Sequence, residues 1–391
     1  MLYRTPLIIF SNHLLYPSET FIRSQAEAMQ RFVPYYVGSR RVHGVQTPAD
    51  RTLLLNRGSA LGRLREIPFK LWGLAPTLAR RIENLNPALV HAHYGPNGLR
   101  VLPLARALDK PLVVTFHGSD ANIKDAFTKH LHYGHRVYAR RKSILQRNGA
   151  LFIAVSDFIR AKLIDQGFPA DRTITHYIGI DTNVFHPDDA SKRQPVVLFV
   201  GRLIENKGVP YLIRAMSHVQ NELPDAELVV IGDGVLRAQL EQAAKSSLRK
   251  YRFLGMQPHE VVRDWMRIAK VVVQPSITLE SGGAEGLPIV LGEAQAMGIP
   301  VVSSRMAGIP EVVQDGASGF LVEERDWRSL AAGIAMLFTD EALWHRFSRE
   351  GRRKICAEFD LHRQTEKLEM IYDSVVEKSH RANQPAPMNV Q

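Results

Sequence analysis

The sequence contains little cysteine, no long apolar segment and too few acidic residues to balance its basic ones. Cys356 is the single cysteine, so an internal disulfide framework and a structural zinc site of clustered cysteines are both excluded. The apolar start, MLYRTPLIIFSNHLLY, is interrupted by Ser11, Asn12 and His13, and no later segment has the length of a membrane span. We therefore expect a cytoplasmic protein of a reducing compartment, without an obvious secretion signal and not integral to a bilayer.

The overall composition is that of a soluble globular protein with a strong basic balance. Hydrophobic residues make up 45% and charged residues 23% of the chain, which are ordinary proportions for folded domains. A length of 391 residues exceeds what one core usually organises, so we expect two domains. The net charge of +11 indicates an anionic partner, which could be nucleic acid, a phosphorylated small molecule or a lipid surface.

Short β-rich segments alternate with helical patterns along the chain. They occur at 6–11, 33–39, 88–94, 110–118 and 151–157, and again at 195–202, 226–234, 251–255, 269–276 and 298–304. This alternation predicts an α/β protein with two parallel sheets. The polar stretch 180–194 has no apolar periodicity, so we place the linker there, between an N-terminal domain 1–186 and a C-terminal domain 187–358. A terminal helix is expected over 359–380, followed by a disordered tail over 381–391.

Two glutamates flank the start of one predicted helix in the segment SGGAEGLPIVLGEAQAMGIPVV, residues 281–302. The glycines around Glu285 let a ligand approach the backbone, and Pro288 suits the first helical position. The helix is expected over 289–297, with Gly298 as its stop. At about 1.5 Å per residue, Glu293 lies roughly 7–8 Å along the axis from the free amides at the helix start. This spacing suits a long ligand with hydroxyls at both ends and negative charge in the middle.

Two basic residues follow the strand predicted at 195–202. Arg202 ends that strand and Lys207 opens the next helix, where a cation opposes the helix macrodipole. Together with the backbone of Gly286, Leu287 and Pro288, the two side chains could bind a diphosphate. The alternative is a pair of solvated basic residues on a loop.

A histidine stands at the end of a strand in the first half. Ligands of open parallel sheets bind beyond the carboxyl ends of the strands, and His117 lies there in a His-Gly-Ser-Asp sequence that ends at Asp120. Such a histidine can donate to a sugar hydroxyl or stabilise developing charge, although a single histidine more often has a structural role. The turn at 232–234, Gly-Asp-Gly, lacks the full dinucleotide fingerprint, so its functional and structural interpretations stay equally open.

In this order, the motifs resemble those of the retaining glycosyltransferases of family 4, which have the GT-B fold. The resemblance covers nearly the whole chain: HAHY and TFHGSD in the first half, AVSDFIRAKLIDQGF and YIGIDTNVFHP before the linker, then VGRLIENKG, LVVIGDG, VVVQPS, EGLPIVLGEAQAMGIPVV and GIPEVVQDGASGFLV. It implies two Rossmann-like domains that face a central cleft, with the terminal helix crossing back to the first domain.

The resemblance also implies a role for each candidate residue. Glu285 would lie at the donor sugar, Glu293 at the ribose hydroxyls, and Arg202 and Lys207 at the diphosphate of a UDP- or GDP-sugar. His117 would contact the donor sugar from the other domain. The implied activity is hexose transfer with retention. We expect neither a metal nor another cofactor, because the segments around the site contain no Asp-x-Asp pair.

Two departures from the family pattern concern the first strand-to-helix loop and the linker. Many relatives have a glycine pair where this chain has NHLLYPSETFIRSQ, so Glu19 and Thr20, with Asp120, become candidate acceptor or loop contacts. The Pro-Ser-Glu-Thr-Phe stretch is similar to members that build bacterial exopolysaccharides and lipopolysaccharides. The usual Asn-Gly before Ile-Asp is Ile178-Gly179 here, which removes one polar contact near the cleft.

The N-terminal half is expected to take the acceptor, because the donor motifs lie in the other half. Residues 57–85 mix Arg and Lys with Leu, Ile, Phe and Trp72, and residues 135–147 form a second basic cluster. Such segments can lie on an anionic membrane, here the inner face of the cell membrane, and meet a lipid-linked glycan acceptor. An ordinary amphipathic helix with a solvated basic face is the alternative.

Three other functions stay open. A sugar-nucleotide epimerase shares the fold but needs no acceptor. A glycosidase also uses two carboxylates, yet it has no use for a helix N-terminus flanked by Arg202 and Lys207. A basic protein that binds nucleic acid or another anion without catalysis would explain the charge. The chain contains no recognisable basic-aromatic module, so we expect no nucleic-acid partner.

Overall fold

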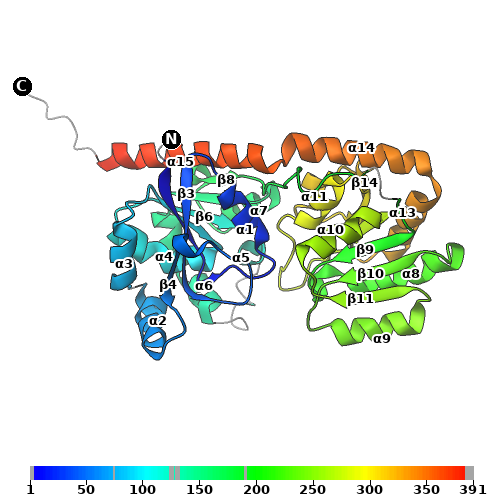
Figure 1. The fold of residues 1–391 in the computed structure, drawn as a ribbon, viewed down its shortest axis with the longest axis horizontal. Helices are drawn as coiled ribbons and strands as arrows, with labels where there is room; N and C mark the ends of the chain where they lie inside the picture. The colour runs from blue at the N-terminus through cyan, green and yellow to red at the C-terminus, as the bar shows by residue number, and fades with distance from the viewer. Residues whose placement is uncertain (1–3, 74, 123–126, 128–132, 189–191, 384–391) are drawn as a thin grey trace, which may run out of the picture. The chain divides into compact units, whose positions relative to one another are not determined.

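The computed structural model describes residues 4–73, 75–122, 127, 133–188 and 192–383, and Figure 1 shows the course of the chain. The chain divides into two compact units. Each has one sheet in which neighbouring strands are parallel, so the predicted α/β fold with two parallel sheets is confirmed. The first unit comprises Met1–Val155, Ile159–Gly179 and Leu361–Gln391, and the second comprises Ser156–Phe158 and Ile180–Asp360.

The first unit is built on an eight-stranded sheet with the order β2-β3-β1-β5-β6-β7-β8, and β4 also pairs with β3. Its central strands β5 and β6 are buried along their whole length, as parallel strands covered by helices on both faces should be. The strands are β1 Thr5–Phe10, β2 His13–Leu14, β3 Phe32–Arg41, β4 Thr52–Asn56, β5 Val90–His93, β6 Leu112–Phe116, β7 Leu151–Ala154 and β8 Thr173–Thr175. The helices are α1 Thr20–Glu27, α2 Ala60–Trp72, α3 Pro76–Glu83, α4 Gly95–Ala107, α5 Ser119–Asn122, α6 Tyr133–Asn148, α7 Asp157–Asp165 and α15 Leu361–Asn383.

The second unit is built on a six-stranded sheet with the order β11-β10-β9-β12-β13-β14. Helix α8 packs against α9 and α13, and α11 packs against α14. The strands are β9 Val196–Val200, β10 Glu227–Ile231, β11 Tyr251–Gly255, β12 Val271–Gln274, β13 Val301–Ser304 and β14 Gly319–Val322. The helices are α8 Val209–Glu222, α9 Arg237–Ser247, α10 His259–Ile268, α11 Ile289–Ala296, α12 Ile309–Val312, α13 Trp327–Thr339 and α14 Glu341–Glu358.

Apart from the short segment Ser156–Phe158, the chain passes between the units after Gly179 and after Asp360, and these two passages lie side by side. The Ile180 amide donates to the Phe359 carbonyl at 2.7 Å, and Thr182 Oγ1 donates to Asp360 Oδ2 at 2.6 Å. These bonds attach the start of the polar stretch 180–194 to the second unit, which therefore begins at Ile180 and not at residue 187. Gly179 is required at the passage, because a Cβ atom there would lie 2.6 Å from the Cα of Leu361.

The terminal helix α15 belongs to the first unit. The Glu369 carboxylate accepts hydrogen bonds from the backbone amides of Gln30, Arg31 and Phe32 at 2.9, 2.7 and 3.2 Å. The Tyr372 hydroxyl lies 2.6 Å from Nδ1 of His91. The predicted tail began at residue 381, but α15 continues to Asn383, and residues 384–391 lie outside the described residues.

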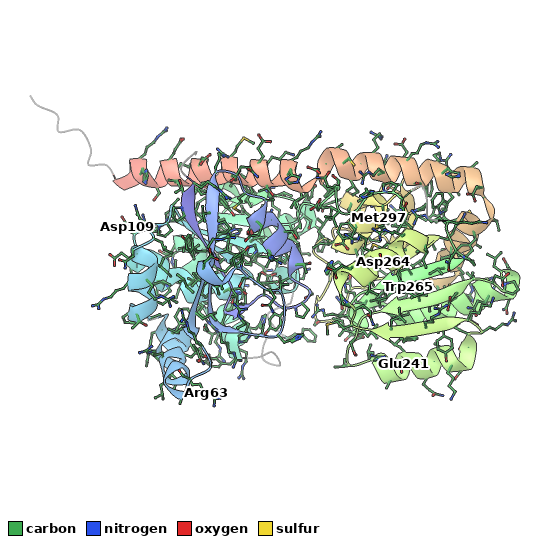
Figure 2. The ribbon with its side chains drawn as sticks, viewed as in Figure 1. Arg63, Asp109, Glu241, Asp264, Trp265 and Met297 are labelled. Atoms are coloured by element: carbon green, nitrogen blue, oxygen red, sulfur yellow. The ribbon has the colours of Figure 1, made fainter. Side chains whose placement is uncertain are left out.

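Helix α11 confirms the predicted helix within one residue. Pro288 is its N-cap, with an extended backbone, and so precedes the helix instead of occupying its first position as the sequence predicts. The buried Met297, labelled in Figure 2, is the C-cap, and Gly298 follows with a φ of +66°. The left-handed glycine ends the helix as the sequence predicts.

Candidate active site

Two loops of the second unit meet beyond the carboxyl ends of β9 and β12. The loop after β9 contains a single 3₁₀ turn, Glu205–Lys207, and ends at Gly208 with a φ of +65°. A Cβ atom at Gly208 would lie 1.8 Å from the carbonyl oxygen of Pro275, so this approach requires glycine. The Ile277 amide also donates to the Asn206 carbonyl at 2.8 Å. These contacts hold Lys207 beside the loop that leads to Glu285.

Lys207 and Glu285 form an ion pair there. Lys207 Nζ lies 2.7 Å from Glu285 Oε1, and Ser276 Oγ donates to the same oxygen at 2.9 Å. The side chains are 15% and 10% exposed, so water screens the pair less than it screens a surface ion pair. An ammonium group has three N–H donors, so Lys207 retains donors for an anionic ligand. The chain itself thus supplies the anion that compensates the Lys207 cation.

Arg202 and the backbone at the start of α11 provide donors without partners. Arg202 is exposed, and its guanidinium has no hydrogen-bond or ion-pair partner among the described residues. In the same part of the chain, the amides of Gly286, Leu287 and the first two residues of α11 donate to no group that the structure describes. Free amides at a helix start attract anions because the N–H groups and the helix dipole both point outward there.

The loop that precedes α11 is held through the carbonyl group of Gly286. Ser156 Oγ donates to the Gly286 carbonyl at 3.0 Å. Gly308 lies against the same carbonyl, and a Cβ atom at that glycine would be 2.1 Å from the oxygen. The Gly286 carbonyl and the Leu287 N–H belong to one planar peptide group, so these contacts also fix the direction of the Leu287 amide.

Glu293 lies in the second turn of α11 and is partly buried. Burial raises the pKa of its carboxyl to about 7. Within the described residues the carboxyl has no hydrogen-bond or ion-pair partner. Burying a carboxyl without a hydrogen-bond partner costs free energy, and a ligand that donates hydrogen bonds removes this cost. Such groups are common at functional sites.

His117 follows β6 in the first unit and lies among aromatic rings. Its Nε2 is 3.0 Å from Nδ1 of His93, and its ring centroid is 4.7 Å from that of Tyr94 and 5.0 Å from that of Phe21. Its Nδ1 is buried without a hydrogen-bond partner in the described part of the chain. Burial lowers the pKa of His93 to about 3 and holds the pKa of His117 well below its usual value. Both imidazoles are therefore neutral at pH 7.

Asp120 supports the His117 loop from inside. One carboxylate oxygen accepts from the amides of His117 and Gly118 at 3.1 and 3.0 Å, and the other accepts from the Gly95 amide at 2.9 Å. The side chain is buried, and burial raises the pKa of the carboxyl against the lowering effect of these backbone bonds. Asp120 thus fixes the backbone that presents His117.

Glu19 and Thr20 lie at the start of α1. The buried Glu19 carboxylate accepts from the Tyr16 amide at 2.8 Å and is hydrogen-bonded to the Tyr94 side chain. Burial raises the pKa of this carboxyl. Thr20 is the first residue of the helix. The two candidate carboxylates in the first unit, those of Glu19 and Asp120, therefore order loops. That either of them contacts an acceptor stays a prediction.

The structure brings the predicted residues together within each unit. Lys207 contacts Glu285 directly, and His117 is supported by Asp120. The sequence reasoning missed the hydrogen-bond partners Ser276, Ser156 and His93. Each lies at or just after the end of a predicted strand, in the segments VVVQPS, LFIAVSD and ALVHAHY, so position after a strand was the signal that could have found them.

No group of three or more His, Cys, Asp or Glu side chains in residues 4–383, apart from the gaps stated above, is arranged to hold a metal ion. No helix in the same part of the chain is both long and apolar enough to cross a bilayer.

The two units, each with a parallel sheet and with candidate residues beyond its strand ends, have the GT-B fold, as the similarity to solved structures shows. A glycosyltransferase from Rickettsia africae superposes with a TM-score of 0.75 at 17% identity, over 96% of this chain and 99% of that one. Anabaena HepE, solved in complex with UDP and glucose, superposes with a TM-score of 0.73 at 19% identity, over 95% of this chain and 100% of HepE.

Sequence comparisons then show the family. The model of Glycosyltransferase Family 4 matches residues 18–184, and the model of Glycosyl transferases group 1 matches residues 182–354. The chain belongs to these glycosyltransferases, so the predicted family is confirmed. An uncharacterised glycosyltransferase of Methanocaldococcus jannaschii is 30% identical over 69% of this chain and 71% of its own.

A relative from a bacterial polysaccharide pathway is also similar. The amylovoran biosynthesis glycosyltransferase AmsK of Erwinia amylovora is 32% identical over 278 residues, which are 70% of this chain. The match spans 66% of AmsK, just under two thirds of its length.

Proposed function

We propose that this protein is an enzyme that transfers a hexose from a UDP- or GDP-sugar to a hydroxyl group of a glycan acceptor, during synthesis of a bacterial cell-surface polysaccharide. The observation that carries the proposal is the group of donors without partners in the second unit, Arg202 and the amides before and at the start of α11, beside the Lys207–Glu285 pair. The UDP bound to HepE supports the donor class, and the name of AmsK supports the pathway.

The donor is bound through its charge and its hydroxyls in this proposal. Arg202, Lys207 and the backbone amides of Gly286, Leu287 and the first two residues of α11 bind the diphosphate, since charge-assisted bonds to phosphate oxygens are the strong ones. Pro288 has no N–H and so donates no bond itself. Glu293 accepts hydrogen bonds from the ribose. Such bonds favour the ionised carboxylate and so oppose the effect of burial on its pKa.

Transfer proceeds with retention and without a metal ion. Glu285 is already bonded to Lys207 and Ser276, which supports a positioning and electrostatic role over that of a nucleophile. The acceptor hydroxyl forms its bond to the anomeric carbon on the face from which the diphosphate leaves, and the departing phosphate oxygen takes the hydroxyl proton. Arg202, Lys207 and the free amides stabilise the charge that develops on the leaving group, which is the task a metal would otherwise perform.

His117 is the proposed catalytic residue of the first unit. Its imidazole is neutral at pH 7, and its Nδ1 is the ring nitrogen not engaged by His93. A neutral imidazole nitrogen can hydrogen-bond a sugar hydroxyl. Because Nδ1 is buried in the free protein, this role requires the surrounding side chains to uncover it when the donor binds.

We further propose that the acceptor is linked to a lipid and that the protein associates reversibly with the inner face of the cell membrane. Helix α2 supports this proposal. Its Leu64, Ile67 and Trp72 are 63%, 51% and 61% exposed, and its exposed Arg63 is labelled in Figure 2. Exposed apolar residues among basic ones suit the surface of an anionic bilayer.

A panel of UDP-, GDP- and dTDP-sugars tests the function. Binding to the folded state raises the unfolding temperature, by an amount equivalent to about 2.7 kcal/mol at a hundred times the dissociation constant. We expect one nucleotide class to raise it and NMR to show a glycoside when a glycan acceptor is added. Release of a rearranged nucleotide sugar without acceptor would identify an epimerase, and no shift with any nucleotide sugar would favour a non-catalytic anion-binding protein.

A further inference from the structure

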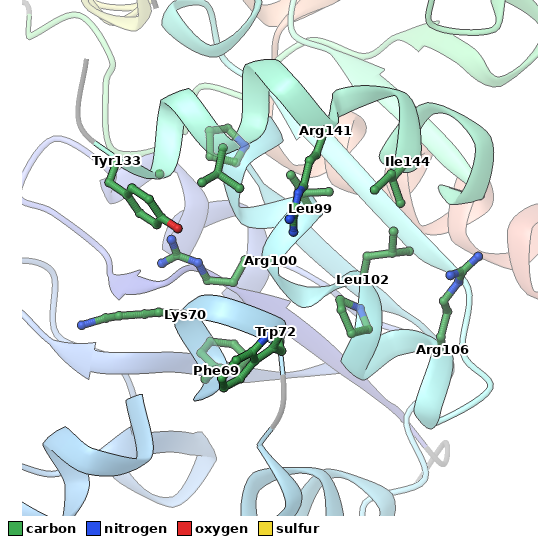
Figure 3. A pocket seen from close by; sticks show the side chains of 15 residues that line it. Phe69, Lys70, Trp72, Leu99, Arg100, Leu102, Arg106, Tyr133, Arg141 and Ile144 are labelled. Atoms are coloured by element: carbon green, nitrogen blue, oxygen red, sulfur yellow. The ribbon is translucent and has the colours of Figure 1, made fainter. Parts of the chain in front are cut away.

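A pocket of about 460 Å³ lies in the first unit between α2, α4 and α6. Figure 3 shows its lining from close by, with Phe69, Lys70 and Trp72 from α2, Arg100 from α4, and Tyr133 and Arg141 from α6. Its volume lies within the range of sites that bind small molecules. The two basic segments singled out in the sequence, 57–85 and 135–147, both contribute to this one pocket.

The charge of the pocket is entirely positive. Among the described residues that line it, four are basic and none is acidic. Lys70 is paired with Glu66 at 2.5 Å, and Arg106 is bonded to Asn148. Arg100 and Arg141 have no hydrogen-bond or ion-pair partner among the described residues.

Arg100 is the informative one of these two side chains. It is partly buried, and that burial lowers the pKa of its guanidinium although Glu66 opposes the shift. Figure 3 shows it between Tyr133 and Lys70. Burying a guanidinium without a hydrogen-bond acceptor costs free energy. Its planar array of N–H donors matches the oxygens of a phosphate, which would supply the acceptors.

The remainder of the lining is apolar or aromatic. Phe69 is fully buried, whereas Trp72 and Tyr133 are 61% and 58% exposed. Exposed aromatic rings beside a basic pocket suit a ligand with an anionic head and an apolar chain, because the rings cover the chain while the arginines neutralise the head.

We propose that this pocket binds the phosphate or diphosphate of the lipid-linked acceptor, with the first part of the lipid chain on the exposed rings of Trp72 and Tyr133. The inference rests on the proposed function, and it adds the place at which the acceptor's carrier is held. A concave pocket with an inward arginine selects one head group, whereas a flat basic surface would attract anionic lipid in general.

Equilibrium binding of farnesyl diphosphate to the full chain tests the proposal, with excess UDP or GDP present to occupy the donor site. We expect inorganic diphosphate and farnesol each to bind at least about tenfold more weakly, because each lacks one half of the ligand. Arg100→Met and Arg141→Met should weaken farnesyl diphosphate binding at least about tenfold. Arg140→Met is the matched control, since Arg140 is an exposed neighbour on α6 that does not line the pocket, and it should change binding by less than about twofold.

Equal effects of Arg140→Met and Arg141→Met would overturn the proposal, as would undiminished binding by Arg100→Met. Displacement of farnesyl diphosphate by phosphatidylglycerol vesicles at comparable phosphate concentration would show a site for bulk phospholipid and also overturn it. The nucleotide-sugar thermal shift, repeated on Arg100→Met, keeps the two proposals apart. If Arg100→Met keeps the thermal shift, the variant is folded and its donor site is intact. If the unmodified protein already shows no shift, the proposed function alone fails.

Discussion

Lys207 Nζ and Glu285 Oε1 are 2.7 Å apart, although they come from loops that follow two different strands. The pair connects the residue proposed for the diphosphate with the residue proposed for the donor sugar. A substitution at either position therefore leaves the other charge shielded from water without its partner, and effects on stability and on donor binding must be measured separately.

Lys207→Met and Arg202→Met should both weaken donor binding at least about tenfold, since each removes a charge-assisted bond worth about 1.5–3 kcal/mol. Their effects on the free protein should differ. Lys207→Met leaves Glu285 without its cation and should lower the free energy of unfolding by about 1–3 kcal/mol, whereas Arg202 has no partner to lose among the described residues. Calorimetric titration and thermal unfolding measure the two quantities.

Lys245→Met and Arg349→Met are the matched controls, because both residues are exposed in the second unit and lack partners among the described residues. An unchanged donor dissociation constant in Lys207→Met and Arg202→Met would remove the diphosphate assignment.

Donor affinity should rise with pH through the titration of Glu293. Its carboxyl has a pKa of about 7 in the free protein, so it is about one tenth ionised at pH 6 and nine tenths ionised at pH 8. If the carboxylate binds the ribose, the dissociation constant should fall about tenfold between these values. The dependence should vanish in Glu293→Gln, and a similar pH profile in that variant would contradict the assignment.

The free energy of unfolding of the free protein should fall as the pH rises, which is opposite to the change in donor affinity. Because the folded-state pKa is raised from the ordinary glutamate value of 4.5 to about 7, the folded state holds more protons than the unfolded state between these pH values. Stability is then lost as the pH rises through this window. Glu293→Gln should therefore be more stable than the unmodified protein above pH 7, by up to about 3 kcal/mol, with the difference vanishing near pH 4.

Asp120→Ala should destabilise the first unit by about 2–4 kcal/mol, because it removes the acceptor of three backbone amides. Turnover should fall as well, since the loop that carries His117 loses its support. Denaturant unfolding measures the first effect. Asp165→Ala, at an exposed position without a partner among the described residues, should stay within about 0.5 kcal/mol; equal stability of the two variants would show that Asp120 does not support the loop.

The product from an α-linked donor should be an α-glycoside, formed equally well in EDTA. Glu285→Gln should reduce turnover strongly, because a neutral amide pairs poorly with Lys207, and no sugar–enzyme adduct should accumulate. NMR of the product and mass spectrometry of the variant decide the course. A β-glycoside refutes retention, an adduct at Glu285 indicates double displacement, and loss of activity in EDTA indicates a metal.

Binding to anionic vesicles should be reversible and weaken as salt rises from low to physiological concentration, because charges on a surface are screened over about 8 Å at physiological ionic strength. Leu64→Ser with Ile67→Ser should reduce flotation. Val235→Ser with Met256→Ser, at positions that are 88% and 62% exposed in the second unit, should leave it unchanged. Failure of the unmodified protein to float at low salt would point to a soluble acceptor.

The sequence was sufficient for the central strands, but of the described edge strands it predicted only β11. Every segment predicted as a strand contains one, whereas β2, β4, β8 and β14 were not predicted. These four have a neighbour on one side only among the described strands. Central parallel strands are apolar because helices cover both faces, and that pattern is visible locally. An edge strand is defined by the neighbour that it finds, which composition does not show.

The linker is a second case. Polarity placed it at 180–194, and local composition supports that choice. The stretch nevertheless starts inside the second unit, because Ile180 and Thr182 bond to residues at the far end of the chain sequence, Phe359 and Asp360. Such a pairing has no local signal.

The sequence by itself determined which residues follow the central strands, because the position of a side chain relative to a strand end depends on short-range periodicity. The family and the roles of the candidate residues came from the resemblance of its motifs. The tertiary structure decided how those residues are paired. It gave Lys207 an internal counter-ion, left Arg202 and Glu293 without partners among the described residues, and made Asp120 a support for His117. It also joined two basic segments into one pocket. These outcomes depend on desolvation and on contacts between distant segments, both of which exist only after the chain has folded.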